Sequence, residues 1–491
     1  MSDSYMDNKD HSNKNSLIKG ISSQTLITII IGLLNVVSFA FFSRLLSKES
    51  FGYFAALNAI IMVFQGISEA GLGSAVIQKK DYTKQYFSTA FTLSLIVSSS
   101  LALILFIFAT PIALLVSDET LIKPIRIICV LLITNSISSV GWAIMMRKLK
   151  FFRYGMIQVV SYILSYGIGI YLAFKGYGLY SLVISAVLNS VLTCLFVFSF
   201  EVRIPRLYIE RSDCRQIVSF GGWLTASVMV NQLTFQLDKL VLSKWLSVIE
   251  LGAYSRPSGF IGTISDRFNG IFDTVLFPIL SKIQDDAERI KQSFLDAISL
   301  LNSFSAVLAA VFFFNAELII QIFFGNEWLD ITYVFRIISL GVVLMVDARL
   351  MDCFFRSLAL VRLNFILRLI CMFIMLGALF IGSRHGIVGV AYGVVIANTI
   401  SIIIKMTVLC NHINVPLIKV LHEFLSSLKP VILLCVLGVV YILFVDKTII
   451  CNVAFAILFA IVTGVEFILC PKMVSTKYAL FIEPYLKRFR K

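Results

Sequence analysis

The sequence has few charges, few histidines and few prolines, and these shortages exclude several classes of protein. Charged residues make up 14% of the 491 positions, well below the roughly one quarter that is typical of soluble domains. The four histidines do not pair at metal-ligand spacing, and the nine cysteines form no C-x-x-C. Because the cysteines lie singly and mostly in apolar runs, we interpret them as small buried side chains rather than disulfide partners. We expect no metal and no other cofactor.

Catalytic motifs are missing as well. The sequence contains no Walker loop, no G-x-S-x-G and no acidic pair in a loop large enough to bind a nucleotide sugar. A polysaccharide polymerase or ligase would need a large outer loop, and the longest outer connector, at about 315–330, is too short for one. We therefore predict that the protein is not an enzyme and that it does not drive transport with ATP by itself.

Long apolar runs are what the sequence does have. Hydrophobic residues make up 58% of it, and its mean hydropathy is +0.91. Runs of about 20 apolar residues, the length that crosses a bilayer, centre near positions 33, 62, 100, 132, 165, 190, 230, 266, 304, 345, 373, 398, 437 and 460. The pattern predicts an all-α integral membrane protein with about fourteen transmembrane helices.

The net charge of +14 is a topology signal rather than a sign of nucleic-acid binding. Of the 42 Lys and Arg residues, 28 fall in segments on the side of the N-terminal tail and 8 on the opposite side. This asymmetry predicts that both termini are cytoplasmic. The run Leu26–Phe42 is long enough to stay in the membrane as an anchor, so we expect no cleaved signal peptide.

Two segments recur about two hundred positions apart. The first, Arg44–Phe54, is echoed by Lys244–Tyr254, with Gly52 and Gly252 identical and in step. In the second, Arg147-Lys-Leu-Lys-Phe-Phe-Arg153 matches Arg356-Ser-Leu-Ala-Leu-Val-Arg362. Two halves repeated in the same order predict two helical lobes with an aqueous cleft between them, as in an alternating-access transporter.

This repeat organises the whole chain into two parallel six-helix lobes and two appended helices. We predict a disordered cytoplasmic tail (1–20), an N-lobe (21–200), a basic linker (201–215), a C-lobe (216–410), an interfacial segment (411–427), two further spans (428–470) and a basic cytoplasmic tail (471–491).

Polar residues inside the predicted spans mark the candidate site, because intramembrane polarity is costly and tends to face a cavity. In the first lobe they form two helical stripes that are largely uncharged, Gln24–Thr28–Asn35 and Asn58–Gln65–Glu69. Interhelical hydrogen bonding is an equally good interpretation of the amides. Glu69 is either a proton-linked carboxylate or a surface group.

The second lobe carries paired charges. Acids and bases share its seventh, eighth and tenth spans: Asn231, Asp238 and Lys239; Arg256, Asp266, Arg267 and Asp273; Arg336, Asp347, Arg349 and Asp352. An arginine fork matches phosphate oxygens, so these stripes predict a solvated lumen that binds an anionic group. The alternative is mutual neutralisation, with Asp238–Lys239, Asp266–Arg267 and Asp347–Arg349 as structural pairs.

These patterns lead to the following assignments. The predicted substrate contacts are Arg256, Arg267, Arg349, Lys239, Asn231, Asn35, Gln24 and Gln65. The predicted sites for a coupling ion are Asp238, Asp266, Asp347 and Glu69. Arg368 and Glu466 stand alone in their spans, and for these we expect packing or headgroup contacts, with a mild effect of Arg368→Ala.

A set of short motifs lies in order along residues 18–470: Ala70-Gly-Leu-Gly73 with Gln78, Ser88-Thr-Ala-Phe91, Arg147–Phe151, Gly176-Tyr-Gly178, Ser219-Phe-Gly221, Asn231, Asp238, Leu246, Gly252, Tyr254, Phe277-Pro278 and Ser281–Asp286. With these motifs the sequence resembles the polysaccharide-transport family of bacterial flippases, within the multidrug/oligosaccharidyl-lipid/polysaccharide exporter superfamily. Arg256-Pro257 and Asp266-Arg267 depart from the family pattern, which suggests a site tuned to a particular glycan, for example an acidic one.

The resemblance implies a fourteen-helix protein in a bacterial inner membrane. It would move an undecaprenyl-diphosphate-linked oligosaccharide from the cytoplasmic to the periplasmic leaflet, in contact with membrane lipid and alongside polysaccharide polymerase and chain-length proteins. The alternatives are a cation-coupled multidrug antiporter, which the intramembrane arginines disfavour, and a scaffold for glycan assembly, which leaves the repeats without a purpose.

Overall fold

The protein is helical throughout the part of the chain that the structure describes. The computed structural model describes residues 26–69, 84–115, 118–147, 150–201, 205–271, 276–444 and 449–469, and no strand occurs in these ranges. Ten helices within them are long and apolar enough to cross a membrane, or eleven if one bent pair counts as a single span. The all-α membrane class is confirmed, while the count of fourteen remains a prediction.

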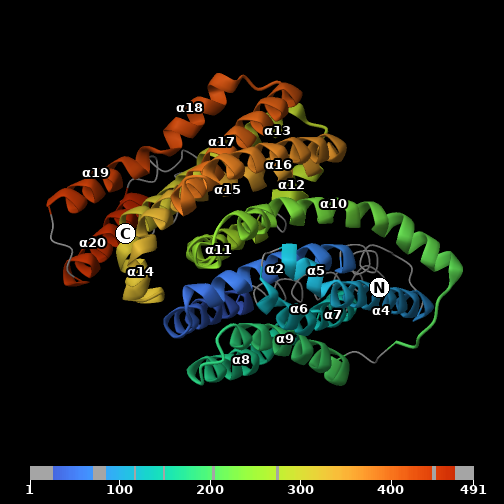
Figure 1. The fold of residues 1–491 in the computed structure, drawn as a ribbon. Helices are drawn as coiled ribbons and strands as arrows, with labels where there is room; N and C mark the ends of the chain where they lie inside the picture. Colours follow the sequence, from blue (N-terminus) through green and yellow to red (C-terminus); the bar gives the residue numbers. More distant parts are fainter. Residues whose placement is uncertain are drawn as a thin grey trace, which may run out of the picture. The chain divides into compact units, whose positions relative to one another are not determined.

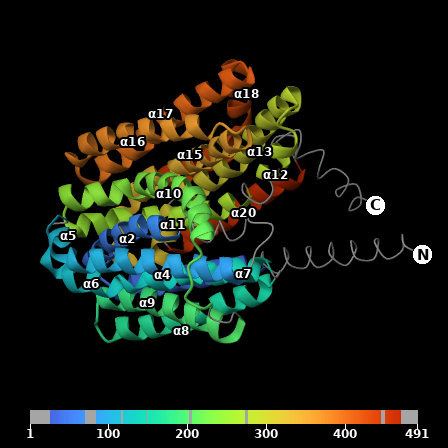
Figure 2. The same cartoon turned by 90° about the vertical axis from the view of Figure 1, so that its right-hand side faces the viewer.

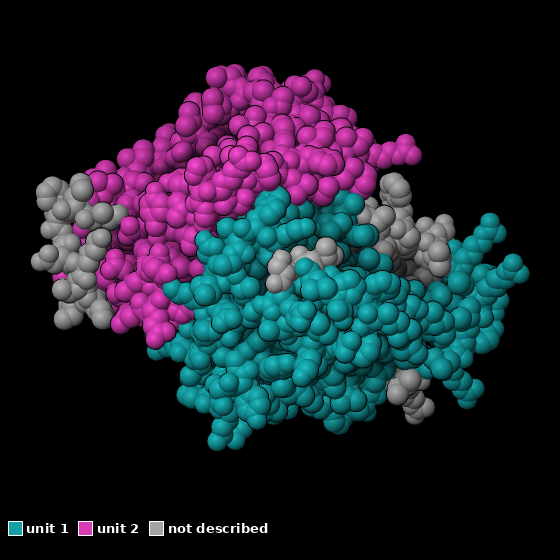
Figure 3. Space-filling view, in the orientation of Figure 1, with its two compact units in different colours: residues 1–252 teal, residues 253–491 magenta. Residues whose placement is uncertain are grey.

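Contacts divide the chain into two compact units, residues 1–252 (unit 1) and 253–491 (unit 2) (Figure 3). Figures 1 and 2 show the helices of each unit. Unit 1 contains the helix Leu26–Leu45, α2 (Lys48–Glu69), α4 (Lys84–Ile107), α5 (Ala109–Leu115), the 3-10 turn η1 (Glu119–Leu121), α6 (Ile122–Ile128), α7 (Val130–Arg147), α8 (Phe151–Phe174), α9 (Leu179–Phe196), the π-helical turn η2 (Val197–Glu201), α10 (Arg211–Trp245) and the start of α11 (Val248–Ile271).

Unit 2 holds the rest of α11 and the remaining helices. They are α12 (Phe277–Lys282), α13 (Ala287–Phe314), α14 (Ala316–Phe323), the 3-10 turn η4 (Asn326–Ile331), α15 (Thr332–Ser357), α16 (Val361–Ser383), α17 (Gly386–Ile413), α18 (Leu417–Ser427), α19 (Lys429–Phe444) and α20 (Ile449–Leu469).

The helices are apolar on their outer as well as their inner faces. Leu33, Phe174, Phe373 and Ile381 each leave more than 60% of their surface uncovered by protein. A helix that satisfies its own backbone hydrogen bonds can present such a face to lipid, where no water is available to do so. The exposed apolar side chains are therefore the surface expected at the hydrocarbon core rather than a defect of packing.

The order of elements after α2 recurs after α11. A long helix, a short helix, a 3-10 turn and then further long helices follow one another over residues 84–201 and again over 287–413, with the short helix α6 as an additional element in the first set. The contact-based division nevertheless falls at Gly252, beyond the predicted linker at 201–215, because α10 packs against α2 inside unit 1. The lobe boundaries remain predictions.

The predicted linker is partly helical and is fastened to α4. Its last residues, from Arg211, form the first turn of α10. Ahead of them the backbone N–H groups of Tyr208 and Glu210 donate to the hydroxyls of Thr92 (3.1 Å) and Thr89 (3.0 Å), one helical turn apart on α4. The predicted linker is thus hydrogen-bonded to α4, a helix of the predicted N-lobe.

A close helix crossing in unit 1 joins the two echoed glycines. A Cβ on Gly52 would overlap the carbonyl oxygen of Val248, and a Cβ on Gly252 would overlap the carbonyl oxygen of Lys48. The contact is reciprocal: each glycine faces the residue four positions before the other. Only a residue without a side chain permits such an approach of two backbones.

Unit 2 is built around α13, α15 and α17. Its core cluster includes Phe294 of α13 and Phe354 of α15, which meet edge to face with ring centroids 5.1 Å apart. The amphipathic helix α18 packs against α13 through its buried Val420, while Ile418 on its other side is 71% exposed. A bend of 46° separates α18 from α19. That α18 lies at the membrane interface remains a prediction.

Candidate functional site

The predicted site residues of unit 1 lie on three helices. Asn35, in the helix Leu26–Leu45, donates to the carbonyl oxygen of Ile31 (2.8 Å) and accepts from the Tyr162 hydroxyl of α8 (3.0 Å). Its amide therefore has the interhelical role that is common inside membranes. Gln65 is half-buried on α2. Any contact of either residue with substrate remains a prediction.

Asp238 and Lys239 are neighbours on α10 and both are half-buried. The Lys239 ammonium donates to Gln236 Oε1 (3.2 Å), and its backbone N–H donates to Asp238 Oδ1 (2.8 Å). Gln236 in turn donates to the Met62 sulfur of α2 (2.9 Å). The polar face of α10 thus packs against α2 through an amide, with the charges next to it.

Several predicted residues fall outside the described part of the chain. Gln24 precedes it, and the side chains of Glu69, Asn231, Asp266, Arg267 and Glu466 are not described although their backbones are helical. Their assignments stay as the sequence predicts them.

In unit 2, Arg256 on α11 and Arg349 on α15 are half-buried, whereas Asp347 on α15 is fully buried. Neither carboxylate oxygen of Asp347 has a hydrogen-bonding partner among the described residues. The alternative pairing of Asp347 with Arg349 is therefore wrong. Two residues apart on a helix, their side chains point about 200° apart, on opposite sides of the axis.

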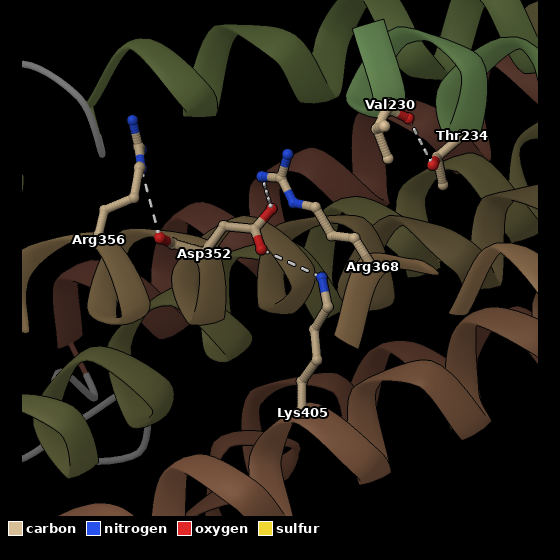
Figure 4. Close-up of polar contacts among 6 residues, drawn as sticks. All are labelled: Val230, Thr234, Asp352, Arg356, Arg368 and Lys405. Atoms are coloured by element: carbon tan, nitrogen blue, oxygen red, sulfur yellow. Dashed lines mark hydrogen bonds and ion pairs between the residues drawn. The ribbon is translucent and has the colours of Figure 1, made fainter. Parts of the chain in front are cut away.

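An ion cluster centred on Asp352 joins three helices of unit 2 (Figure 4). Its carboxylate receives Arg368 Nη2 of α16 at 2.9 Å and Lys405 Nζ of α17 at 3.1 Å. Arg356, one turn further along α15, directs its Nε at the Asp352 carbonyl oxygen (3.4 Å). The side chains of Asp352 and Lys405 are 10% and 8% exposed, so water screens this attraction weakly.

The Asp352 cluster corrects two expectations. Arg368 is not isolated, because it is ion-paired with Asp352. Lys405 is one of the 28 basic residues that the sequence assigns to segments on the side of the N-terminal tail, but it is buried within α17, which continues to Ile413, rather than lying in a connector. The partners lie 16 and 53 positions from Asp352, so no local spacing marks them. The carboxylate of Asp352 thus contacts two cations, while Arg356 reaches the backbone carbonyl oxygen of the same residue.

A family model described as "Polysaccharide biosynthesis protein" matches residues 41–333. The chain belongs to this polysaccharide biosynthesis protein family. The match runs from the end of the helix Leu26–Leu45 into the start of α15. It therefore includes Gly52, Gly252, Asp238 and Arg256.

Two curated relatives resemble the chain at low identity. The lipopolysaccharide biosynthesis protein WzxC of Escherichia coli (strain K12) is 23% identical over 397 residues, which is 80% of each chain. The succinoglycan biosynthesis transport protein ExoT of Rhizobium meliloti (strain 1021) is 25% identical over 299 residues, or 60% of each chain.

The fold is that of a known transporter structure. The structure titled "Lipid II flippase MurJ, inward closed conformation" superposes with a TM-score of 0.71 and 18% identity. The match covers 90% of this chain and 98% of that one. At this identity the likeness concerns the fold.

Proposed function

We propose that the protein is a flippase that moves an undecaprenyl-diphosphate-linked oligosaccharide from the cytoplasmic to the periplasmic leaflet for surface polysaccharide synthesis. The observation that carries this proposal is the match of residues 41–333 to a polysaccharide biosynthesis family in a chain with the MurJ fold. Relatives named for lipopolysaccharide biosynthesis and succinoglycan transport support the substrate class. No observation favours the multidrug antiporter.

The chemistry of the transport step rests on the charged spans. A diphosphate with a sugar headgroup cannot enter hydrocarbon unaided, because an unpaired charge there is very costly. We propose that Arg256, Arg267, Arg349 and Lys239 hold the phosphates, since guanidinium groups bind phosphate oxygens in bidentate fashion. Amides from Asn231, Asn35, Gln24 and Gln65 would meet the headgroup, while the polyprenyl chain stays in lipid.

Transport against a gradient needs a coupling ion. Asp238, Asp266, Asp347 and Glu69 are the carboxylates proposed to bind one, by analogy with the intramembrane acids of other transporters. The protein would lie in the inner membrane of a bacterium, with both termini cytoplasmic, next to the polymerase and chain-length proteins that use its product.

The test is genetic and chemical. Deleting the gene should remove surface polysaccharide and leave lipid-linked repeat units on the cytoplasmic leaflet. Restoring it with Arg256→Ala or Arg349→Ala should lower export about tenfold or more, because a lost charge-assisted contact costs about 1.5–3 kcal/mol. Arg384→Ala is the matched control, since Arg384 lies at the end of α16 over the Phe380 ring (4.9 Å). Normal export in both arginine variants would reject the assignment.

A further inference from the structure

Arg336 of α15 is a cation inside the predicted tenth span that the proposed transport site does not use. The residue is half-buried, and its Nε has no hydrogen-bonding partner among the described residues. The acids on the two elements just before α15, which are Glu317 of α14 and Glu327 and Asp330 of η4, make no ion pair with it. An arginine within a span that lacks a counter-ion is costly, which marks it as a candidate binding group.

One aromatic ring lies beside the guanidinium. The Arg336 Cζ is 6.0 Å from the centroid of the Phe313 ring, at the end of α13. The face of an aromatic ring attracts a cation, but it neither neutralises the charge nor accepts the N–H groups in the manner of a carboxylate or a phosphate. Among the described residues, the ring therefore positions the guanidinium and leaves its five N–H donors unused.

Two tyrosines supply a further hydrogen-bond donor close to Arg336. Tyr333 precedes it by three residues on the same face of α15, where the side chains of a helix are neighbours. The Tyr333 hydroxyl lies 2.7 Å from the Tyr392 hydroxyl of α17, and both side chains are exposed. Since this contact uses one of the two O–H groups as donor, the other O–H is available to an acceptor from outside the protein.

These groups lie at a similar depth, next to an exposed apolar surface. Arg336 is the fifth residue of α15 and Tyr392 the seventh of α17, so each is roughly 6–9 Å from the start of its helix at 1.5 Å per residue. One turn further along, Leu340 of α15 and Ile396 of α17 leave 50% and 54% of their surface uncovered. A cation and a hydroxyl that border exposed hydrocarbon suit an amphiphile with a charged head and an apolar tail.

We propose that Arg336, together with the Tyr333–Tyr392 hydroxyl pair, forms a binding site for the phosphate group of a lipid. A guanidinium presents two parallel N–H groups to two phosphate oxygens, and the tyrosine O–H donates to a third. The site lies at the end of unit 2 that the basic residues predict to be periplasmic. Tyrosines are common at this depth in membrane proteins, so the site depends on Arg336 and not on the tyrosines alone.

Two kinds of lipid carry the phosphate that this site requires. One is an anionic phospholipid of the bilayer, such as phosphatidylglycerol, which would fasten unit 2 to its leaflet. The other is a polyprenyl diphosphate, and in that case the inference rests on the proposed function. The carrier would then have a second contact, because Arg336 lies 13 residues, roughly 20 Å of helix, from the predicted lumen residue Arg349.

The experiment measures thermal unfolding of the full-length protein, purified in detergent, during titration with four ligands. These are dioleoylphosphatidylglycerol, dioleoylglycerol (the same tails without phosphate), undecaprenyl diphosphate and inorganic phosphate. A ligand that binds only the folded state raises the melting temperature, and the readout is the ligand concentration that gives half of the rise. Each protein is compared with its own ligand-free melting temperature, so a variant that is less stable in itself still gives an answer.

The variants are Arg336→Gln and the double variant Tyr333→Phe/Tyr392→Phe. Glutamine keeps a polar side chain at the position and removes its charge. The control is Arg384→Gln, because Arg384 belongs to the same unit and also lies over an aromatic ring, that of Phe380, but is exposed at the end of α16.

A lipid-phosphate site predicts that Arg336→Gln raises the half-saturating concentration about tenfold or more, since a charge-assisted contact is lost. The tyrosine double variant should raise it severalfold, and Arg384→Gln should match the wild type. With dioleoylglycerol the four proteins should not differ. An effect of Arg336→Gln with phosphatidylglycerol identifies the bilayer lipid as the ligand, and an effect confined to undecaprenyl diphosphate identifies the carrier.

Equal half-saturating concentrations for the wild type and Arg336→Gln with both lipids would overturn the inference, as would a response to inorganic phosphate alone that depends on Arg336. Because the measurement involves no transport, either result would leave the flippase proposal intact. That proposal is tested separately, by the surface glycan that remains after gene deletion.

Discussion

At the scale of single residues, the burial of an ion pair decides how much it matters. Asp352, Arg368 and Lys405 are largely shielded from water, whereas the Lys291–Glu288 pair of α13, although closer at 2.6 Å, involves a glutamate that is 82% exposed. Exposed pairs add little to stability because solvent and salt screen them. Removing one member of a buried group leaves an uncompensated charge.

We expect Asp352→Ala to destabilise the folded protein by about 3–5 kcal/mol, since it leaves Arg368 and Lys405 facing one another without their shared carboxylate. Arg368→Ala should also lower stability, in contrast to the mild effect that the sequence predicts. The measurement is thermal unfolding in detergent, with Glu288→Ala as control. Equal melting temperatures for Asp352→Ala and Glu288→Ala would contradict this account.

The sequence located the charged residues but could not pair them. Charge inside a long apolar run is visible in the letters alone, so Asp347, Asp352 and Arg368 could be singled out. Their partners depend on how each helix is rotated and on which helix lies beside it, and neither property is encoded over a few residues. The sequence therefore suggests an ion pair of Asp347 with Arg349, which is near it along the chain, whereas the side chain that interacts with Asp347 in the structure is Asn302 of α13.

At the scale of elements, the crossing of α2 and α11 depends on two glycines. The two helices approach so closely that a single added carbon on either would occupy the space of the other's backbone. Backbone cannot move aside as the end of a flexible side chain can. The identity of Gly52 and Gly252 in the sequence repeat therefore has a packing cause.

We expect Gly52→Ala and Gly252→Ala each to force the helices apart and to lower both stability and transport. Gly167→Ala in α8 and Gly259→Ala in α11 are controls, because nothing lies within 4 Å of the added carbon. In a helix such a change should stabilise by about 0.5–1 kcal/mol. Melting temperatures and export of surface glycan provide the readouts. A Gly52→Ala protein as stable as Gly167→Ala would refute the close crossing.

Helix positions were the most predictable property of the elements. Runs of apolar residues about 20 long mark them directly, and α8, α16 and α17 lie where their runs do. The lengths of α10 and α11 were harder to foresee, because both carry several charges. The 35 residues of α10 extend well beyond the apolar centre near residue 230, into part of the predicted linker.

At the scale of the whole molecule, the distribution of basic residues predicts the orientation in the membrane. Reporter fusions at Ile209 and Ala359 should be fluorescent with green fluorescent protein and inactive with alkaline phosphatase, which folds only outside the cytoplasm. Fusions at Gly176 and His385 should give the reverse pattern. Active phosphatase at Ala359 would mean that the predicted orientation is inverted.

The general architecture can be predicted from the sequence, because two short segments that recur in the same order imply a duplicated set of helices. The recurrence of elements over 84–201 and 287–413 agrees with that interpretation. The boundary between the two units at Gly252 cannot be predicted from the repeat. It depends on the packing of α10 against α2, and hydropathy does not predict which helices pack together.

The meeting of Gly52 with the segment around Gly252 has a consequence for how the gene can change. After a duplication, each copy is ordinarily free to drift on its own. Here a larger side chain at either glycine would clash with the backbone beside the other glycine, because the two helices are in contact at these positions. We therefore expect selection to retain both glycines together, even where the rest of the two repeats has little remaining sequence similarity.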